Sequence, residues 1–250
     1  MKKWKSYKPG VADKKFDAII IGSGIGGLCT AALLSLKGKR VLVLEKHFKI
    51  GGWTHTFRRD NYEWDVGIHY IGQVHNSSSP IRRLFDLISD GKLKWSPMDK
   101  NYDRIIFPDK SYNFVAPREQ FIEDMISYFP KEESGIMTYM DLLDQAALSA
   151  RSYFNNKAFP GIFSTITYPF MTRKFFSYSD NTTLDVLSSL TDDQQLIGVL
   201  TGQWGDHGLP PAQSSFAMHA MVARHYLDGG NYPTGSSRSI AETISDLIES

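Results

Sequence analysis

The sequence predicts an α/β protein in which a βαβ unit with parallel strands is joined to a second, mixed α+β region. Three observations predict this class. The 250 residues are 42% apolar and 22% charged, which is typical of a chain that folds around a core. An apolar run, a cluster of glycines and a small-residue helical segment follow one another within residues 16–36. An alternating aromatic hairpin and several helical segments occupy the middle of the chain.

Charge and cysteine content exclude several classes of protein. Lys and Arg number 28 against 27 Asp and Glu, so no net positive field favours binding to nucleic acid. The single cysteine, Cys29, excludes a disulfide framework and a cysteine-rich zinc site, and it fits a reducing, cytoplasmic location. No metal site is expected, because His219 and His225 are six apart, off the spacing that aligns two ligands on a helix.

The first fifteen residues form a basic tail, with six lysines and one acid. Clustered lysines are attracted to anionic lipid, which leaves peripheral membrane contact open. Residues 18–36 are uncharged and nearly long enough to span a bilayer. Gly22, Gly24, Gly26 and Gly27 interrupt this stretch, however, and such a cluster predicts a tight turn rather than a continuous membrane helix.

The glycine cluster lies between a strand and a helix. Residues 16–21 form the short apolar run of a buried parallel strand, and the glycines that follow have the spacing G-x-G-x-x-G. In this motif Gly22 allows the sharp exit from the strand, Gly24 lets a pyrophosphate approach the backbone, and Gly27 lets the helix pack against the sheet. The helix would offer its first-turn N–H groups and positive dipole end to the pyrophosphate. These features predict a Rossmann-type dinucleotide-binding unit.

A second strand and an acid complete the motif. Residues 40–44 form another buried strand, which ends at Glu45, eighteen residues beyond Gly27. An acid there accepts the hydroxyls of an adenosine ribose and repels a 2′-phosphate, so FAD or NAD is expected and NADP is not. Gly51 and Gly52 follow, and they would let a second loop lie close to the same pyrophosphate.

Three segments resemble one group of flavoproteins. The run from Asp17 to Gly52 resembles the extended FAD fingerprint of the glutathione-reductase-like flavoproteins. The run Asp65-Val66-Gly67-Ile68-His69-Tyr70-Ile71-Gly72 resembles a stretch that lies against the flavin in the phytoene desaturase and carotenoid isomerase family, closest to its all-trans-retinol 13,14-reductase (retinol saturase) branch. Residues 204–245, with a glycine-flanked Tyr232-Pro233, resemble a later part of that branch that borders the substrate cavity. Trp53 and Ser236 depart from the pattern, which often has a basic residue and a glycine at these places.

The resemblance implies a Rossmann-type FAD-binding domain of the glutathione-reductase-like kind, with an inserted α+β substrate or cap domain. The residues expected to bind the cofactor are Gly22, Ser23, Gly24, Ile25, Gly26, Gly27, Glu45, Lys46, Gly51, Gly52, Trp53, Thr54, Gly67 and His69. The predicted catalytic residues are His69 and Tyr70, because the resemblance places their stretch near the flavin ring. The alternative for His69 is a structural role, which is the more common one for a lone histidine.

The expected organisation is a basic tail at 1–15, an FAD-binding βαβ unit at 16–72, a substrate or cap domain at 73–228 and a return toward the FAD domain at 229–250. The chain is expected to be the amino-terminal half of a longer pattern, without the carboxy-terminal segment that completes the cofactor site. A hairpin is predicted at 102–115, and helices are predicted at 117–128, 131–154, 183–190, 192–201, 212–227 and 237–249.

Residues 158–172 form an uncharged stretch that is rich in aromatic side chains. Core packing is the favoured interpretation, because buried aromatic residues dominate ordinary cores. The alternative is a segment that lies in the headgroup region of a membrane as an entry for an apolar substrate.

By resemblance, the function would be that of an FAD-dependent oxidoreductase acting on a carbon–carbon double bond of a long apolar polyene, such as a retinoid or carotenoid. The reaction would be saturation, desaturation or isomerisation, with NAD as an electron donor or alternative nucleotide. A flavin amine oxidase would share the glycine turn and is one alternative. The other is an incomplete fragment that binds a nucleotide or lipid without turnover.

Overall fold

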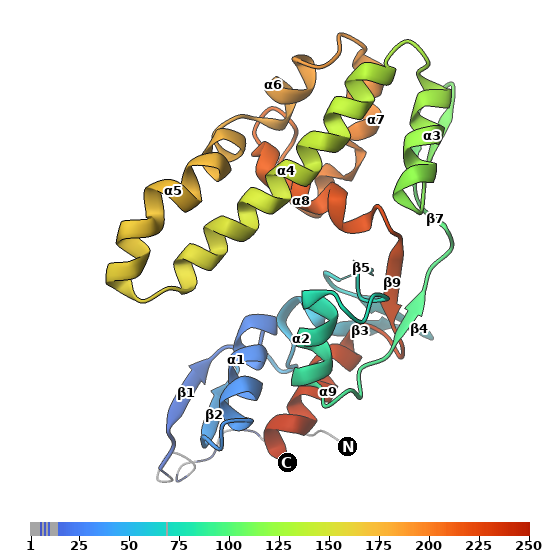
Figure 1. Ribbon diagram of the computed structural model, residues 1–250. Coiled ribbons are helices and arrows are strands. Elements are labelled where there is room, and N and C mark those ends of the chain that lie inside the picture. The colour runs from blue at the N-terminus through green and yellow to red at the C-terminus, as the bar shows by residue number, and fades with distance from the viewer. Residues whose placement is uncertain (1–5, 7, 9, 11–14, 69) are drawn as a thin grey trace. The chain divides into compact units, whose positions relative to one another are not determined.

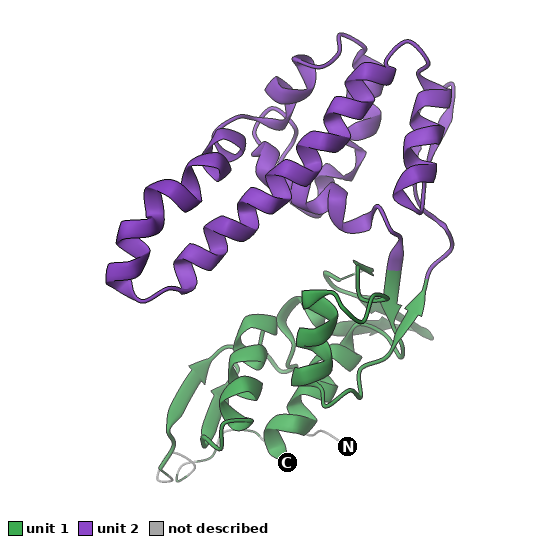
Figure 2. Ribbon diagram, viewed as in Figure 1, with its two compact units in different colours: residues 1–97, 231–250 green, residues 98–230 purple. Residues whose placement is uncertain are grey.

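The computed structural model describes residues 6, 8, 10, 15–68 and 70–250 (Figure 1). These residues form two compact units. Unit 1 contains the described residues up to Pro97 together with Asn231–Ser250, and unit 2 contains Met98–Gly230 (Figure 2). Residues 73–97, which the sequence analysis placed in the inserted region, lie in unit 1, because helix α2 (Pro80–Ile88) contributes Phe85 and Ile88 to its core.

Unit 1 begins with a strand, a turn, a helix and a strand, as the sequence predicts. Strand β1 (Ala18–Ile21) leads to helix α1 (Ile25–Ser35), and β2 (Val41–Leu44) follows. The two strands are parallel, with Ala18 opposite Val41 and Ile21 opposite Leu44. Residues 18–36 are therefore not one continuous helix, and among the residues described here no helix is long and apolar enough to cross a bilayer.

The rest of unit 1 consists of short strands and two helices. The 3₁₀ turn η2 (Gly52–Thr54) precedes an antiparallel hairpin of β3 (Thr56–Arg59) and β4 (Tyr62–Asp65). In a separate sheet, β9 (Gly230–Pro233) lies between β5 (Ile71–Gly72) and β6 (Trp95–Pro97). Tyr232-Pro233 therefore occupies the middle strand of that sheet, and helix α9 (Arg238–Glu249) follows it.

Three helices supply most of the core of unit 1. Helix α9 contributes Ile240, Ile244 and Leu247, whose spacing places them on one face of the helix. They pack against Leu28 and Ala32 of α1. The complete cluster is Leu28, Ala32, Ile71, Val74, Phe85, Ile88, Leu93, Ile240, Ala241, Ile244 and Leu247. Segments from both ends of the described chain thus build one core.

Unit 2 contains the predicted hairpin and helices. Strands β7 (Asn101–Ile106) and β8 (Ser111–Val115) pair antiparallel. The helices are α3 (Arg118–Tyr128), α4 (Glu133–Ala158), α5 (Gly161–Ser179), α6 (Thr183–Ser188), α7 (Gln194–Leu200) and α8 (Phe216–Tyr226), with the 3₁₀ turn η3 (Gly202–Asp206) before α8. Helix α4 packs against both α5 and α8, and α4 and α5 run side by side as a long helical hairpin (Figure 1).

The aromatic stretch at 158–172 is not part of the core, which corrects the favoured interpretation of the sequence. It forms most of α5, where Ile162 is 82% exposed and Phe170 is 85% exposed. Thr172 is the buried residue of this helix. The composition indicated burial because aromatic side chains usually lie inside, but within this stretch the polar side chains Ser164 and Thr167 are the ones that hydrogen-bond Asn156 of α4.

Candidate functional site

The glycine turn between β1 and α1 is shaped by one close contact. A Cβ atom added at Gly27 would lie 2.1 Å from the carbonyl oxygen of Gly22, so only glycine fits at this position. Gly22 itself has a φ of +97°, in the region that favours glycine. At Gly24 and Gly26, an added Cβ would meet nothing within 4 Å. The turn is therefore tight where the helix crosses the end of the strand and open where a ligand would approach the backbone.

Helix α1 begins with N–H groups that its own ladder does not use. The Leu28 N–H donates to the Gly24 carbonyl at 2.9 Å, so the N–H groups of Ile25, Gly26 and Gly27 precede the first bond of the helix. The positive end of the helix dipole lies at the same place, and the first turn holds no acidic residue. This end of α1 suits an anion such as a pyrophosphate.

Glu45 is bound to the glycine turn. Its Oε2 atom accepts hydrogen bonds from the Ser23 backbone N–H at 2.8 Å and from the Ser23 hydroxyl at 2.6 Å, and its Oε1 atom accepts from the His47 N–H at 2.8 Å. Partial burial opposes ionisation, but these hydrogen bonds outweigh it and lower the pKa of Glu45 to about 2. The carboxylate is therefore ionised at neutral pH, with lone pairs left for a ligand hydroxyl.

The second glycine pair lies directly against the first turn. Gly51 forms an isolated parallel bridge with Gly24, and its N–H donates to the Ser23 carbonyl at 3.0 Å. A Cβ added at Gly52 would lie 3.0 Å from the Cα of Gly24. The sequence predicted that this pair approaches the same ligand region, and the structure brings Ser23, Gly24, Glu45, Gly51 and Gly52 together.

The remaining predicted residues lie on the segments that follow. Thr54 is buried and donates to the Gly51 carbonyl at 2.9 Å, whereas Ile25, Lys46 and Trp53 are exposed. The Trp53 side chain covers Gly67, because a Cβ added there would lie 2.7 Å from the Trp53 ring. Tyr70 is half-buried, and His69 lies outside the described residues.

Asp65 links segments of unit 1 in a way that its place at the start of the run 65–72 did not predict. Its carboxylate accepts hydrogen bonds from the Tyr232 phenol, from the Ser237 hydroxyl at 2.6 Å and from the Ser237 N–H at 3.2 Å. The Ser237 hydroxyl also donates to the Thr54 carbonyl at 3.0 Å. These bonds join η2, the end of β4 and the start of α9. The one available signal was an acid at a strand end, directly before Val66-Gly67.

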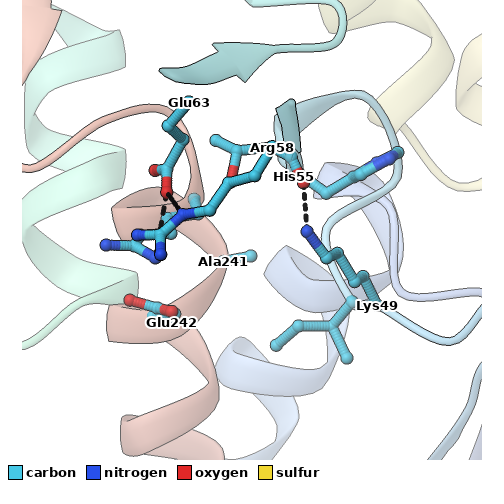
Figure 3. A pocket seen from close by; sticks show the side chains of 9 residues that line it. Lys49, His55, Arg58, Glu63, Ala241 and Glu242 are labelled. Carbon is cyan, nitrogen blue, oxygen red and sulfur yellow. Dashed lines mark hydrogen bonds and ion pairs between the residues drawn. The ribbon is translucent and has the colours of Figure 1, made fainter. Parts of the chain in front are cut away.

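A pocket of about 230 Å³ lies between the β3–β4 hairpin and α9 (Figure 3). The Glu63 Oε2 atom forms ion pairs with Arg58 Nε at 2.8 Å and with Arg238 Nη1 at 3.5 Å. The hydrogen bond from Arg58 is the main cause of the lowered pKa of Glu63. Lys49 donates to the Thr56 carbonyl at the same pocket. Its lining shares no residue with the predicted cofactor site, and much of its charge is paired internally, so the glycine turns remain the better candidate.

His219 of unit 2 has a structural setting. His219 is buried and hydrogen-bonds Tyr139 at 2.9 Å between Nε2 and the phenol oxygen. Burial, with a further contribution from His207, lowers the pKa of His219 to about 3, so its ring is neutral. Within the described part of the chain, no three His, Cys, Asp or Glu side chains gather in a way that could hold a metal ion.

Sequence comparison matches residues 20–87 to the model of the NAD(P)-binding Rossmann-like domain. The chain is 34% identical to an all-trans-retinol 13,14-reductase of Danio rerio, over 93% of this chain and 40% of that protein. An inactive all-trans-retinol 13,14-reductase of Danio rerio is 30% identical, over 98% of this chain and 41% of that protein. A chloroplastic prolycopene isomerase 2 of an Oncidium hybrid cultivar is 28% identical, over 93% and 41%. The chain thus spans about two fifths of the length of these relatives.

Structural comparison supports the same fold. A putrescine oxidase aligns with a TM-score of 0.59 and 16% identity, over 93% of this chain and 49% of that one. A cyclohexylamine oxidase from Brevibacterium oxydans aligns with a TM-score of 0.58 and 19% identity, over 94% and 49%. At this identity the likeness concerns the fold, an α/β dinucleotide-binding architecture with a second, largely helical unit.

Proposed function

We propose that this chain, a homologue of the all-trans-retinol 13,14-reductases and the prolycopene isomerases, forms the FAD-binding part of an oxidoreductase. The substrate would be a retinoid or carotenoid, and the reaction would change one of its carbon–carbon double bonds. The observation that carries the proposal is the bridge between Gly24 and Gly51, which brings two glycine loops together beside Ser23, the residue that binds the Glu45 carboxylate.

FAD fits this arrangement better than NAD or NADP. The Glu45 carboxylate is ionised, so it would repel a 2′-phosphate and accept from the hydroxyls of an unmodified ribose. The bridge from Gly51 to Gly24 brings a second run of backbone against the turn, which suits a ligand that continues past its pyrophosphate. NAD keeps a place in the proposal only as an electron donor.

Different residues of the chain would bind successive parts of the cofactor. The first-turn N–H groups of α1 would bind the pyrophosphate, and Glu45 would bind the ribose. Bound FAD supplies hydride transfer, which no side chain of the protein can provide. Trp53, Gly67 and Tyr70 would lie along the segments that lead toward the flavin, and His69 would be the catalytic residue next to Tyr70. Their tasks would be to orient the polyene and exclude water.

Two alternatives have their own support. A flavin amine oxidase is suggested by the fold of the solved neighbours, although fold alone does not assign a substrate. A binding fragment without turnover is suggested by the inactive relative and by the exposed β1–β2 pair. Ile19 is 61% exposed and Ile21 is 89% exposed, whereas the faces of a parallel sheet are normally covered. In a longer protein, further strands and helices would cover them.

A visible absorption spectrum of the purified chain tests the proposal. A flavin spectrum at one cofactor per chain is expected, either directly or after addition of FAD. A colourless protein that FAD does not reconstitute would contradict the proposal and favour the fragment. If flavin is present, an anaerobic spectral change on adding a retinoid or carotenoid supports the polyene reaction. Bleaching by an amine, with no response to polyenes, would instead assign an amine oxidase.

The variant His69→Ala tests the catalytic role. We expect it to keep its flavin content and lose turnover. Unchanged turnover with retained flavin would show that His69 is structural or dispensable.

A further inference from the structure

Helix α5 presents an apolar face to solvent. Ile162, Phe163, Ile166 and Phe170 are 82%, 61%, 65% and 85% exposed. Positions 162, 166 and 170 are four apart, so they lie on one side of the helix. Contiguous apolar patches of this kind mark an interaction surface rather than the ordinary scatter of exposed apolar residues.

The side of α5 that meets α4 carries polar side chains that hydrogen-bond Asn156, and farther along the helix Phe175 stacks on Tyr153 of α4. Asn156 of α4 is fully buried, and its amide nitrogen donates to the Ser164 carbonyl at 3.0 Å and to the Thr167 hydroxyl at 2.8 Å. The Ser164 hydroxyl donates to the Asn156 amide oxygen at 3.2 Å. A rotation of α5 that buried its apolar face would break these bonds and leave the buried Asn156 amide without partners, which would destabilise the fold. The hydrogen bonds to Asn156 therefore keep the apolar face of α5 turned toward solvent.

The part of the α4–α5 hairpin that lies between Asp144 and Asp180 carries charges of one sign. Between Asp144 and Asp180 the sequence holds no acidic residue, and it holds Arg151, Lys157, Arg173 and Lys174. The Lys157 ammonium lies 4.9 Å from the centroid of the Tyr168 ring and 5.3 Å from that of Tyr153, which holds it at the turn of the hairpin. The chain as a whole is nearly neutral, so this concentration of cations is local.

An exposed apolar helix face beside cations, without acids, complements the surface of an anionic bilayer. Such a helix lies in the plane of the interface, with its apolar side chains at the boundary between headgroups and acyl chains. None of the described helices is long and apolar enough to span a bilayer.

We propose that the exposed face of α5, formed by Ile162, Phe163, Ile166 and Phe170 and accompanied by Arg173 and Lys174, docks the protein on an anionic lipid bilayer. The docking does not depend on the reaction proposed above. It would bring unit 2 to the compartment in which an apolar polyene is dissolved.

Vesicle flotation tests the proposal with three variants of the purified protein. Wild-type protein is expected to float with vesicles of phosphatidylcholine and phosphatidylserine, and to float less with phosphatidylcholine alone. The pair Ile162→Ser and Phe170→Ser should lower the partition coefficient about 100-fold, because two apolar side chains no longer leave water. The pair Arg173→Gln and Lys174→Gln should lower it roughly 25-fold on the anionic vesicles. Ile106→Ser, at a residue 74% exposed on β7, is the matched control and should bind as the wild type does.

Each result has a definite meaning. Binding of all variants at the wild-type level, or no flotation of the wild type, would overturn the proposal. A third result would also overturn it: the wild type self-associates without lipid, the pair Ile162→Ser and Phe170→Ser abolishes this association, and the wild type does not float with vesicles. The face would then join two copies of the chain. Circular dichroism and melting curves check that the variants fold. An unchanged flavin spectrum in the variants separates this test from that of the cofactor site.

Discussion

Tyr232 donates a hydrogen bond from its phenol to the carboxylate of Asp65, across a sequence separation of 167 residues. Burial raises the pKa of Tyr232, and the hydrogen bond to Asp65 and its negative charge raise it further, to about 12. Ser237 donates to the same carboxylate through its hydroxyl and its backbone N–H. One side chain therefore joins the end of β4, from which the chain continues to Gly67, to the segment that opens α9.

Replacing this carboxylate should loosen unit 1. We expect Asp65→Asn to lower the free energy of unfolding by about 1–3 kcal/mol, because its donors lose a charged acceptor. The phenolate absorbance of Tyr232 should also appear at lower pH than in the wild type. Urea unfolding and an absorbance titration measure the two effects. The control is Glu249→Gln, at an exposed position on α9, which should change neither; equal effects of the two variants would show that Asp65 does not have this role.

Two glycines of the turn should respond differently to alanine. Gly27→Ala places a Cβ 2.1 Å from the Gly22 carbonyl oxygen, and we expect it to lower the free energy of unfolding of the apoprotein by about 3 kcal/mol. Gly24→Ala meets nothing within 4 Å, so the apoprotein should unfold as the wild type does. Its FAD affinity should nevertheless fall roughly tenfold or more, because the new methyl group occupies the space of the ligand. Urea unfolding and flavin titration separate the two effects, and similar behaviour of both variants would contradict this interpretation of the turn.

Glu45 should stay ionised in acid. Its pKa lies at about 2 instead of its ordinary 4.5, so the folded protein stabilises the ionised form of the carboxyl group more than the unfolded chain does. The stability that results is fully present above pH 4.5 and is lost as pH falls through about 2. A carboxyl chemical-shift titration by NMR should place the midpoint near 2 in the wild type and nearer the ordinary value in Ser23→Ala. A midpoint that Ser23→Ala does not move would rule out Ser23 as the cause.

His219 should make unit 2 sensitive to mild acid. Its pKa is about 3 instead of 6.5, so the unfolded chain binds the proton more readily between these values and stability falls as pH drops through the window. From pH 7 to pH 5 the loss from this residue amounts to about 2 kcal/mol. Urea unfolding at both values should show a smaller loss in His219→Gln. The exposed His47→Gln should retain the wild-type loss, and a smaller loss in that control would point to a general charge effect.

Local patterns were enough to predict the cofactor end of unit 1. The run from Phe16 to Glu45 takes the expected secondary structure because each step depends on neighbouring residues: an apolar strand, a turn that needs glycine at Gly27, and a helix. The predicted burial of its strands was wrong, since Ile19 and Ile21 are exposed. The meeting of Gly51 with Gly24 also followed from composition, since two glycine runs allow a close backbone approach.

Features set by distant partners were not predictable in the same way. Asp65 receives Tyr232 and Ser237 from the far end of the chain, and no spacing rule connects them. For α5, the sequence contained both Phe170 and Ser164, but which of the two faces α4 depends on Asn156 of another helix. Composition therefore favoured burial of the aromatic side chains, but the hydrogen bonds to Asn156 turn the opposite side of α5 toward α4 and leave Phe170 exposed.

The core of unit 1 also bears on the order in which the protein can fold during synthesis. Leu28 and Ala32 are made early, yet their partners Ile240, Ile244 and Leu247 leave the ribosome only after the whole of unit 2 has been translated. Unit 2 is continuous in sequence and can fold while α9 is still being made. Until α9 is made, α2 can cover α1 only in part, and the apolar surface that α9 later buries stays open to aggregation.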